Sequence, residues 1–203
     1  LAIADKRDSM VGLFGIGQPP TGSKDPFALR RAAIGLLRII VEKQLSLDLG
    51  ELIDASLKTY PADLLQAETR TQVFDFVLER FRAWYLDKGM SSEEFQSVFV
   101  LKPSRPLDFH LRINAVHAFY QLPEAKPLAA ANKRVANILA KQDSSDSVLA
   151  LDESLLSEPA EKTLATEVQQ KELEVAPLFD HGQYTEGLKV LSGLNTSVDT
   201  FFA

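Results

Sequence analysis

Two groups of basic side chains are the residues of this sequence whose types and spacing could do chemistry. One group lies in the segment 18–38, QPPTGSKDPFALRRAAIGLLR, and the other lies between residues 126 and 141. Fixed cations of this kind can neutralise phosphate groups, and an amide side chain among them can read the edge of a base. The first group is Lys24, Arg30, Arg31 and Arg38, and the second is Lys133, Arg134 and Lys141 with the amide of Asn137.

A turn followed by a helix should position the first group. Pro19, Pro20 and Gly22 stop any regular element before residue 25. Asp25 is a favourable N-cap and Pro26 suits the first helical position, so we expect the helix to begin there. Apolar residues then recur at helical spacing and predict a buried stripe beside the arginines: Leu29, Ala33, Leu36, Leu37 and Ile40. An ordinary core helix with a solvated arginine face would produce the same pattern.

A second helix, from Glu124 to Lys141, should carry the other group. Lys133, Asn137 and Lys141 are four residues apart and therefore share a face, with Arg134 beside it. From Lys126 to Lys141 the sequence has four basic residues and no acidic one. The expected buried side is Leu128, Ala131, Val135 and Leu139. A solvated face remains the alternative interpretation.

The charge of the chain is unevenly distributed. The 203 residues have a net charge of -6, but the 12 acidic residues after Gln142 face only 3 lysines, whereas the first 141 residues hold 16 acidic and 19 basic ones. Such asymmetry hints at nucleic-acid contact, although an acidic end can also serve solubility alone. The absence of cysteine excludes disulfides and thiolate metal sites, and no apolar run reaches the roughly 20 residues of a membrane helix. We expect a soluble, cytoplasmic protein without membrane contact.

The remaining pattern predicts an all-α protein. Ser46 or Asp48 should cap a short helix, Ser91 and Glu94 have capping-box spacing, and another helix should begin near Pro106. Longer periodic runs predict helices over about 62–87, from Pro159 to about Val175, and over 184–191, and no segment shows sustained strand alternation. Trp84 and Tyr85 could stack on bases, but core packing fits their register better. No nucleophile constellation or phosphate-binding glycine motif is present, and His110 and His117 are two turns apart, so we predict neither a catalytic site nor a metal site.

Two long segments carry a family resemblance. The stretch from Ala4 through VGLFGIGQPPTGSKDPFALRRAA, and the segments LRINAVHAFYQLPEA and LAAANKRVANIL between Leu111 and Leu139, resemble the beta subunits of bacterial heterotetrameric glycyl-tRNA synthetases. The resemblance covers most of residues 1–141 and is weaker to Phe202. Chains of that family begin far upstream and run a few dozen residues further, so we expect a C-terminal fragment that opens inside a cut helix rather than on a signal peptide.

The resemblance implies a domain plan. Residues 1–15 would be the tail end of a preceding HD-type domain, whose last aspartate would match Asp5. The histidine partners of a metal site are missing, so we expect Asp5 or Asp8 to be a surface carboxylate. Residues 16–142 would form a helical bundle of the class I-type anticodon-binding domain, similar to that of arginyl-tRNA synthetase. Residues 143–203 would be an acidic, truncated C-terminal helical segment.

The resemblance also implies a function. The chain would be the anticodon-binding part of a glycine-tRNA ligase, an aminoacyl-tRNA synthetase of α2β2 assembly, and would position tRNA-Gly while the alpha subunit performs ATP-dependent glycylation. ATP and Mg²⁺ would belong to the whole enzyme, and this fragment would be non-catalytic and hold no cofactor. We expect the two basic faces to converge into one cradle for the tRNA, because the family packs these helices together. Two alternatives remain: a helical protein-protein interaction scaffold without RNA contact, and an HD-type phosphohydrolase remnant, which would need a bound divalent ion.

Overall fold

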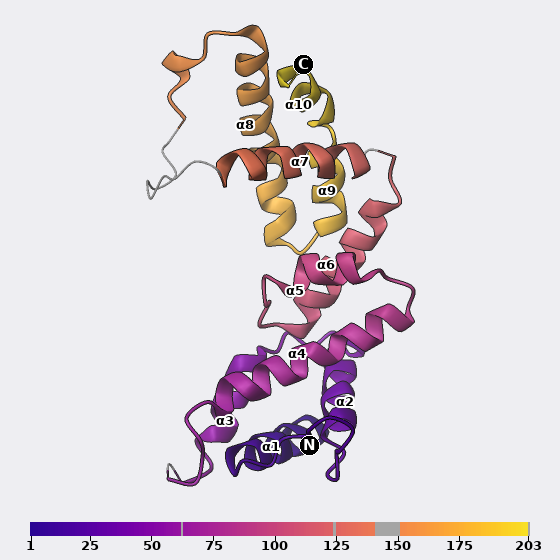
Figure 1. Ribbon diagram of the computed structural model, residues 1–203, viewed down its shortest axis with the longest axis vertical. Coiled ribbons are helices and arrows are strands. Elements are labelled where there is room, and N and C mark those ends of the chain that lie inside the picture. Colours follow the sequence, from indigo (N-terminus) through magenta and orange to yellow (C-terminus); the bar gives the residue numbers. More distant parts are fainter. Residues whose placement is uncertain (62, 124, 141–150, 203) are drawn as a thin grey trace. The chain divides into compact units, whose positions relative to one another are not determined.

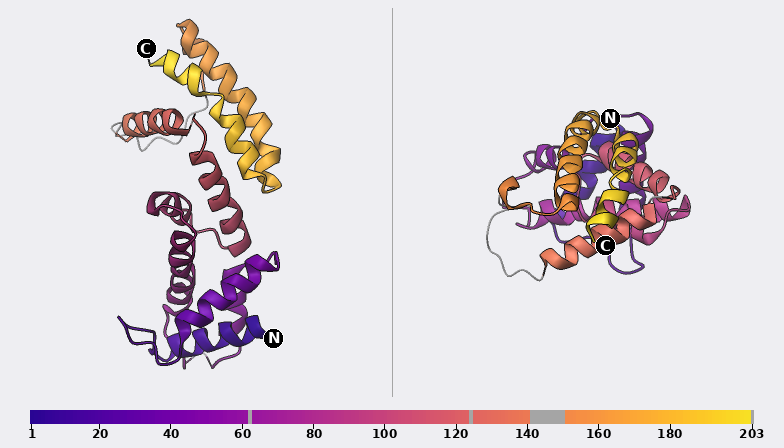
Figure 2. Two further views of the ribbon diagram at one scale, coloured as in Figure 1. Left: turned by 90° about the vertical axis from the view of Figure 1, so that its right-hand side faces the viewer. Right: turned by 90° about the horizontal axis from the view of Figure 1, so that it is seen from above.

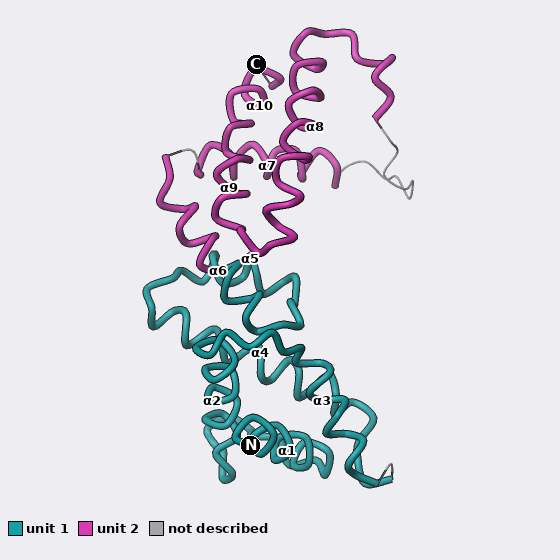
Figure 3. Tube along the Cα trace, turned by 180° about the vertical axis from the view of Figure 1, so that it is seen from behind, with its two compact units in different colours: residues 1–113 teal, residues 114–203 magenta. Residues whose placement is uncertain are grey.

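The computed structural model describes residues 1–61, 63–123, 125–140 and 151–202 (Figure 1). Within these ranges it contains ten α-helices, one short 3-10 helix and no strand apart from an isolated bridge between Thr21 and Lys24. The all-α prediction is therefore confirmed for the described residues. Two compact units divide the chain, unit 1 over Leu1–Ile113 and unit 2 over Asn114–Ala203 (Figure 3). The boundary expected at residues 142 and 143 lies outside the described residues.

Unit 1 is built around a core shared by its helices. α1 packs against α2, α3 and α4, and α4 also contacts α2, α3 and α5. Phe81, Phe95 and Phe109 are fully buried in this core. The helices are α1 (Ala2–Gly15), α2 (Leu29–Glu42), α3 (Leu49–Leu57), α4 (Thr69–Asp87), α5 (Ser92–Phe99) and α6 (Pro106–Tyr120), the last of which begins in unit 1 and ends in unit 2.

The predicted apolar stripe of α2 is confirmed, but the predicted start of the helix is wrong. Leu29, Ala33, Leu36, Leu37 and Ile40 are each at most 1% exposed. The helix begins at Leu29 rather than at Pro26, because Ala28 has a left-handed backbone with φ 55°.

Asp25 nevertheless caps α2 from outside the helix. Its two carboxylate oxygens accept from the backbone amides of Leu29 at 2.8 Å and Arg30 at 3.0 Å. Two of the four amides that a helix start leaves unpaired are therefore satisfied by one side chain that lies three residues before the observed N-cap, Ala28.

The C-terminal half of α1 is covered by a segment that we call the strap, Tyr60, Leu65 and Gln66. A Cβ atom added at Gly12 would lie 2.7 Å from the Tyr60 hydroxyl, and one added at Gly15 would lie 2.1 Å from a Leu65 methyl. The Tyr60 hydroxyl donates to the carbonyl of Asp8 at 3.1 Å, and the amide of Gln66 donates to that of Gly15 at 3.1 Å. The strap explains why α4 begins at Thr69, several residues later than the sequence pattern predicts.

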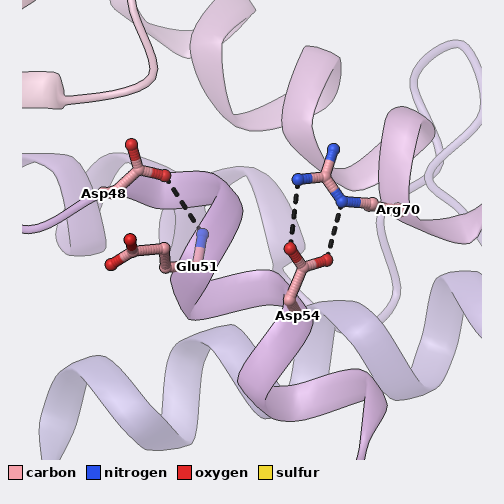
Figure 4. Close-up of polar contacts among 4 residues, drawn as sticks. All are labelled: Asp48, Glu51, Asp54 and Arg70. Atoms are coloured by element: carbon pink, nitrogen blue, oxygen red, sulfur yellow. Dashed lines mark hydrogen bonds and ion pairs between the residues drawn. The ribbon is translucent and has the colours of Figure 1, made fainter.

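Two caps agree with the sequence, and one ion pair joins α3 to α4. Asp48, rather than Ser46, caps α3 by accepting from the amide of Glu51 at 3.1 Å (Figure 4), and the predicted capping box of Ser91 and Glu94 is present at α5. The guanidinium of Arg70 on α4 donates to both carboxylate oxygens of Asp54 on α3, at 2.6 and 3.1 Å (Figure 4).

Of the two aromatic residues predicted to pack in the core at the end of α4, Tyr85 is buried and Trp84 is partly buried. Tyr85 is fully buried against Phe81 and Phe109, and its hydroxyl lies 2.9 Å from Nδ1 of His110. Burial raises the pKa of Tyr85 and lowers that of His110, whose pKa the charge of Lys88 lowers further. This pair is therefore a neutral hydrogen-bonded contact of the core.

Unit 2 contains the remaining helices: α7 (Ala125–Leu139), η1 (Glu153–Leu155), α8 (Pro159–Asp180), α9 (Tyr184–Ser192) and α10 (Asn195–Phe201). α8 packs along α9 and α10, as Figure 2 shows, and α7 contacts α10. α8 continues past Val175 and through Pro177, and α10 is a helix that the sequence did not lead us to expect. The predicted buried side of α7 is partly wrong: Ala131 is buried, whereas Val135 is 37% and Leu139 is 61% exposed.

No helix among the described residues is both long enough and apolar enough to cross a membrane.

Candidate nucleic-acid interface

The turn that precedes α2 is fixed by members of the first basic group. The backbones of Thr21 and Lys24 exchange two hydrogen bonds, at 3.1 and 2.8 Å. The guanidinium of Arg30 donates to the carbonyl of Gly22 at 2.6 Å. Arg30 therefore ties the helix to the turn, and the exposed Lys24 side chain projects from a backbone of defined shape.

Arg38 and Arg31 differ in what they contact. Nε of Arg38 lies 2.8 Å from a carboxylate oxygen of Glu42, in a pair whose side chains are 58% and 51% exposed. Such an exposed pair is weak, so a phosphate could replace the carboxylate at little cost. Arg31 is exposed and makes no ion pair or side-chain hydrogen bond with any described residue. Arg31 is thus the arginine of this group whose donors are available.

The second basic group lies on α7 in unit 2. Lys133, Arg134 and Asn137 are all exposed. The guanidinium carbon of Arg134 lies 4.9 Å from the centre of the Phe202 ring, so its position is supported by a cation-π contact while its edge stays accessible. Lys141 lies outside the described residues. The two basic groups belong to different units, and their convergence into one cradle remains a prediction.

Three further cationic side chains of unit 1 are paired with carboxylates. Arg70 contacts Asp54 through two hydrogen bonds, Arg82 pairs with Glu79, and Lys102 pairs with Asp75. Arg70 is a poor phosphate ligand, because two of its guanidinium nitrogens already donate to the two carboxylate oxygens of Asp54. The ion pairs thus distinguish cations that are engaged within the fold from cations that are available to a ligand, and composition alone does not reveal this distinction.

A hollow between α1 and the start of α2 contains residues that the sequence did not single out as a site. It has a volume of about 370 Å³, and its lining includes Asp5, Lys6, Phe27 and Arg31. Lys6 and Phe27 are 21 positions apart in sequence, and only the packing of α1 on α2 brings them together. The only signal for them in the sequence is that both lie within the family-like stretch that begins at Ala4.

Within the described part of the chain, no three histidine or carboxylate side chains are grouped in a way that could hold a metal ion. Asp5 is exposed on α1. Asp8 is instead half-buried and accepts a hydrogen bond from the hydroxyl of Ser56 at 2.6 Å, which gives it a role in joining α1 to α3.

Comparisons with known proteins agree with one another. The family model described as glycyl-tRNA synthetase beta subunit matches residues 1–100. The whole chain is 52% identical over 202 residues to the glycine-tRNA ligase beta subunit of Pseudoalteromonas translucida, and 55% identical over 204 residues to that of Pseudomonas aeruginosa. It is 49% identical over 202 residues to that of Marinobacter nauticus. The chain spans about 30% of the length of these relatives.

Proposed function

Because this chain belongs to the family of glycyl-tRNA synthetase beta subunits, we propose that it supplies tRNA-binding surface to a glycine-tRNA ligase. The observation that carries the proposal is the similarity along the entire chain to proteins of that name. In this role the chain positions tRNA-Gly, while ATP-dependent glycylation proceeds with the alpha subunit of an α2β2 assembly in the cytoplasm. We assign no step of the glycylation reaction to a residue of this chain.

The finer part of the proposal is recognition of the anticodon. Bases in an anticodon loop are unpaired, so proteins read them by stacking and by hydrogen bonds to their edges, while cations hold the surrounding phosphates. The available charges of Lys24 and Arg31 on unit 1 and of Lys133 on unit 2 support this role. The remaining members of the proposed phosphate clamp are Arg30, Arg38, Arg134 and Lys141, and Asn137 is the proposed reader of a base edge.

The clamp has a measurable electrostatic consequence. If about four phosphates are neutralised, the logarithm of the binding constant falls with the logarithm of salt concentration at a slope near -3, taking about -0.7 per contact for single strands. Between 50 and 200 mM salt this slope corresponds to a loss of affinity of about 50-fold. Binding that does not change with salt would contradict the clamp.

The test uses the complete protein that contains this chain, assembled with its alpha subunit. Gel-shift titration compares tRNA-Gly with a copy whose anticodon is altered, and we expect the altered copy to bind more weakly. Charge reversal by Arg31→Glu and Arg134→Glu should abolish aminoacylation while glycine activation, followed by ATP-pyrophosphate exchange, is retained. Lys43→Glu is the matched control, because Lys43 is an exposed lysine at the other end of α2. Equal binding of both RNAs would refute anticodon recognition.

A scaffold for protein contact is the second candidate function. The exposed apolar side chains on α7 favour it: Val135, Ile138 and Leu139 are 37%, 45% and 61% exposed. A scaffold would tolerate the two charge reversals and would lose its protein partner in an Ile138→Glu variant. Pull-down of the alpha subunit by these variants separates the two candidates.

A further inference from the structure

The hollow between α1 and the start of α2 is shaped by a close approach of the two helices. A Cβ atom at Gly35 of α2 would lie 3.0 Å from Cε of Lys6, so the stem of Lys6 rests on the bare backbone of this glycine. Gly35 is one helical turn after Arg31 and lies on the same side of α2. Lys6 and Arg31 both belong to the lining of the hollow.

An aromatic ring stands among the residues that line the same hollow. Phe27 is 50% exposed, and among the described residues of unit 1 no other phenylalanine, tyrosine or tryptophan is as exposed. The turn that carries it is held on its N-terminal side by the carboxylate of Asp25 and on its C-terminal side by the left-handed Ala28. An exposed aromatic residue on a fixed turn offers a preformed surface for stacking.

The polar groups of the hollow are available to a ligand. Lys6 and Arg31 form no ion pair with any described residue. Asp5 and Ser9 of α1 add a carboxylate and a hydroxyl to the lining. The amides of Leu29 and Arg30 already donate to Asp25, so the two cationic side chains are the main groups here that can hold an anion.

We propose that this hollow binds one unpaired nucleotide of the tRNA, with the base stacked on Phe27 and its phosphate held by Lys6 and Arg31. Asp5 accepts a hydrogen bond from an amino group on the edge of the base. The proposal rests on the proposed tRNA-binding function and adds a site to it. A flat ring, an anion and a hydrogen-bond donor are the three features that this lining matches, and a nucleotide carries all three.

An acidic peptide fits the hollow less well than a nucleotide. It would satisfy Lys6 and Arg31, but an acidic side chain has no planar ring to stack on Phe27 and no donor for the carboxylate of Asp5. The volume of about 370 Å³ lies at the lower end of the range for small-molecule pockets, which begins near 300 Å³. This size suits a single nucleotide rather than a folded segment.

The first test measures affinity of the complete protein for tRNA-Gly. Loss of one stacked base by Phe27→Ala should weaken binding between about 5- and 140-fold, whereas Phe27→Tyr should keep most of the affinity. Lys6→Ala should also weaken binding. Leu101→Ala is the control, because Leu101 is a 63% exposed apolar residue of unit 1 outside this hollow. Wild-type affinity in both the Phe27→Ala and Lys6→Ala variants would overturn the site.

The second test identifies what touches the ring. A photo-reactive benzoylphenylalanine at position 27 should cross-link to one unpaired nucleotide of bound tRNA-Gly, mapped by primer extension. A cross-link to protein, or cross-links scattered over paired nucleotides, would overturn the proposal. If wild-type protein binds tRNA-Gly with the expected salt slope while position 27 gives no RNA cross-link, the site fails and the proposed function stands. If wild-type protein does not bind tRNA-Gly, both fail.

Discussion

Replacing Asp25 by alanine should destabilise unit 1 by a predictable amount. The carboxylate accepts two backbone hydrogen bonds, from Leu29 at 2.8 Å and from Arg30 at 3.0 Å, in a partly buried setting. In the Asp25→Ala variant both amides lose their acceptor at the start of α2, and the negative charge near the positive end of the helix is also lost.

The magnitude follows from the cap and from the size of the unit. An N-cap is worth about 0.5 to 2 kcal/mol, and two bonds to a charged acceptor place Asp25 at about 1.5 to 2 kcal/mol. With about 2.1 cal/mol/K of unfolding entropy per residue, unit 1 (residues 1–113) loses about 4 °C in midpoint for each kcal/mol. We therefore expect the melting midpoint of this unit to fall by about 6 to 8 °C.

The single tryptophan makes the assay specific. Trp84 lies in α4 of unit 1 and is the only tryptophan of the chain, so its fluorescence reports the melting of this unit. Asp25→Asn keeps one acceptor oxygen and should show about half of the loss. Asp63→Ala removes an exposed carboxylate that forms no hydrogen bond or ion pair with any other described residue, and it should leave the midpoint unchanged. Equal midpoints for Asp25→Ala and Asp63→Ala would refute the remote cap.

Three further predictions follow from named contacts. Tyr60→Phe removes the hydroxyl that donates to the carbonyl of Asp8, and should lower the free energy of unfolding in urea by about 1 kcal/mol; an unchanged midpoint would contradict this. Burial of Asp48 raises its pKa, but hydrogen bonds from Ser104 and backbone amides and the charge of Arg105 outweigh it, so the folded pKa is below the ordinary value. The carboxylate therefore stabilises the fold fully above about pH 4 and less as the pH falls, and the stability difference between wild type and Asp48→Asn should shrink on acidification; a constant difference would count against it. Arg31→Ala should make the salt slope of tRNA binding shallower by about 0.7, with Lys43→Ala unchanged.

Helix content and the buried face of α2 could be predicted because they are local properties of the sequence. The spacing of Leu29, Ala33 and Leu36 selects one face, and the caps at Asp48 and Ser91 mark helix starts through bonds within three residues. The start of α2 was misplaced because Asp25 acts across a turn rather than from the adjacent cap position. No sequence rule indicates that Ala28 takes a left-handed conformation, which is unusual for a residue with a Cβ.

Other differences arise from packing between distant segments. The run that led us to begin α4 near residue 62 includes Leu65 and Gln66 of the strap, which pack against Gly15 of α1 instead of continuing the helix. α9 ends at its C-cap, Gly193, but a further helix, α10, follows it, and Ser197 of α10 is buried and donates a hydrogen bond to Glu167 of α8. The stripe on α7 was correctly periodic, yet Val135 and Leu139 lack the covering that the pattern implies.

The candidate site, too, could be predicted only in part from the sequence. The sequence supplied Arg31, since clustered cations are visible in a linear chain, but it did not reveal that Arg70 is neutralised by Asp54 while Arg31 is not. Lys6 and Phe27 became candidates only through the contact between α1 and α2. The convergence of the two basic groups stays a prediction.

The strap packs directly on the glycines of α1, so the sizes of the side chains in these two separate stretches of sequence depend on each other. A methyl group gained at Gly15 occupies volume that Leu65 now fills, and one gained at Gly12 competes with the ring of Tyr60. Enlarging one side alone overpacks the contact, whereas a smaller partner opposite would restore the fit. Paired exchanges such as Gly15→Ala with Leu65→Val should therefore be better tolerated than the glycine replacement alone. Substitutions on this surface of α1 thus require a compensating substitution in the strap.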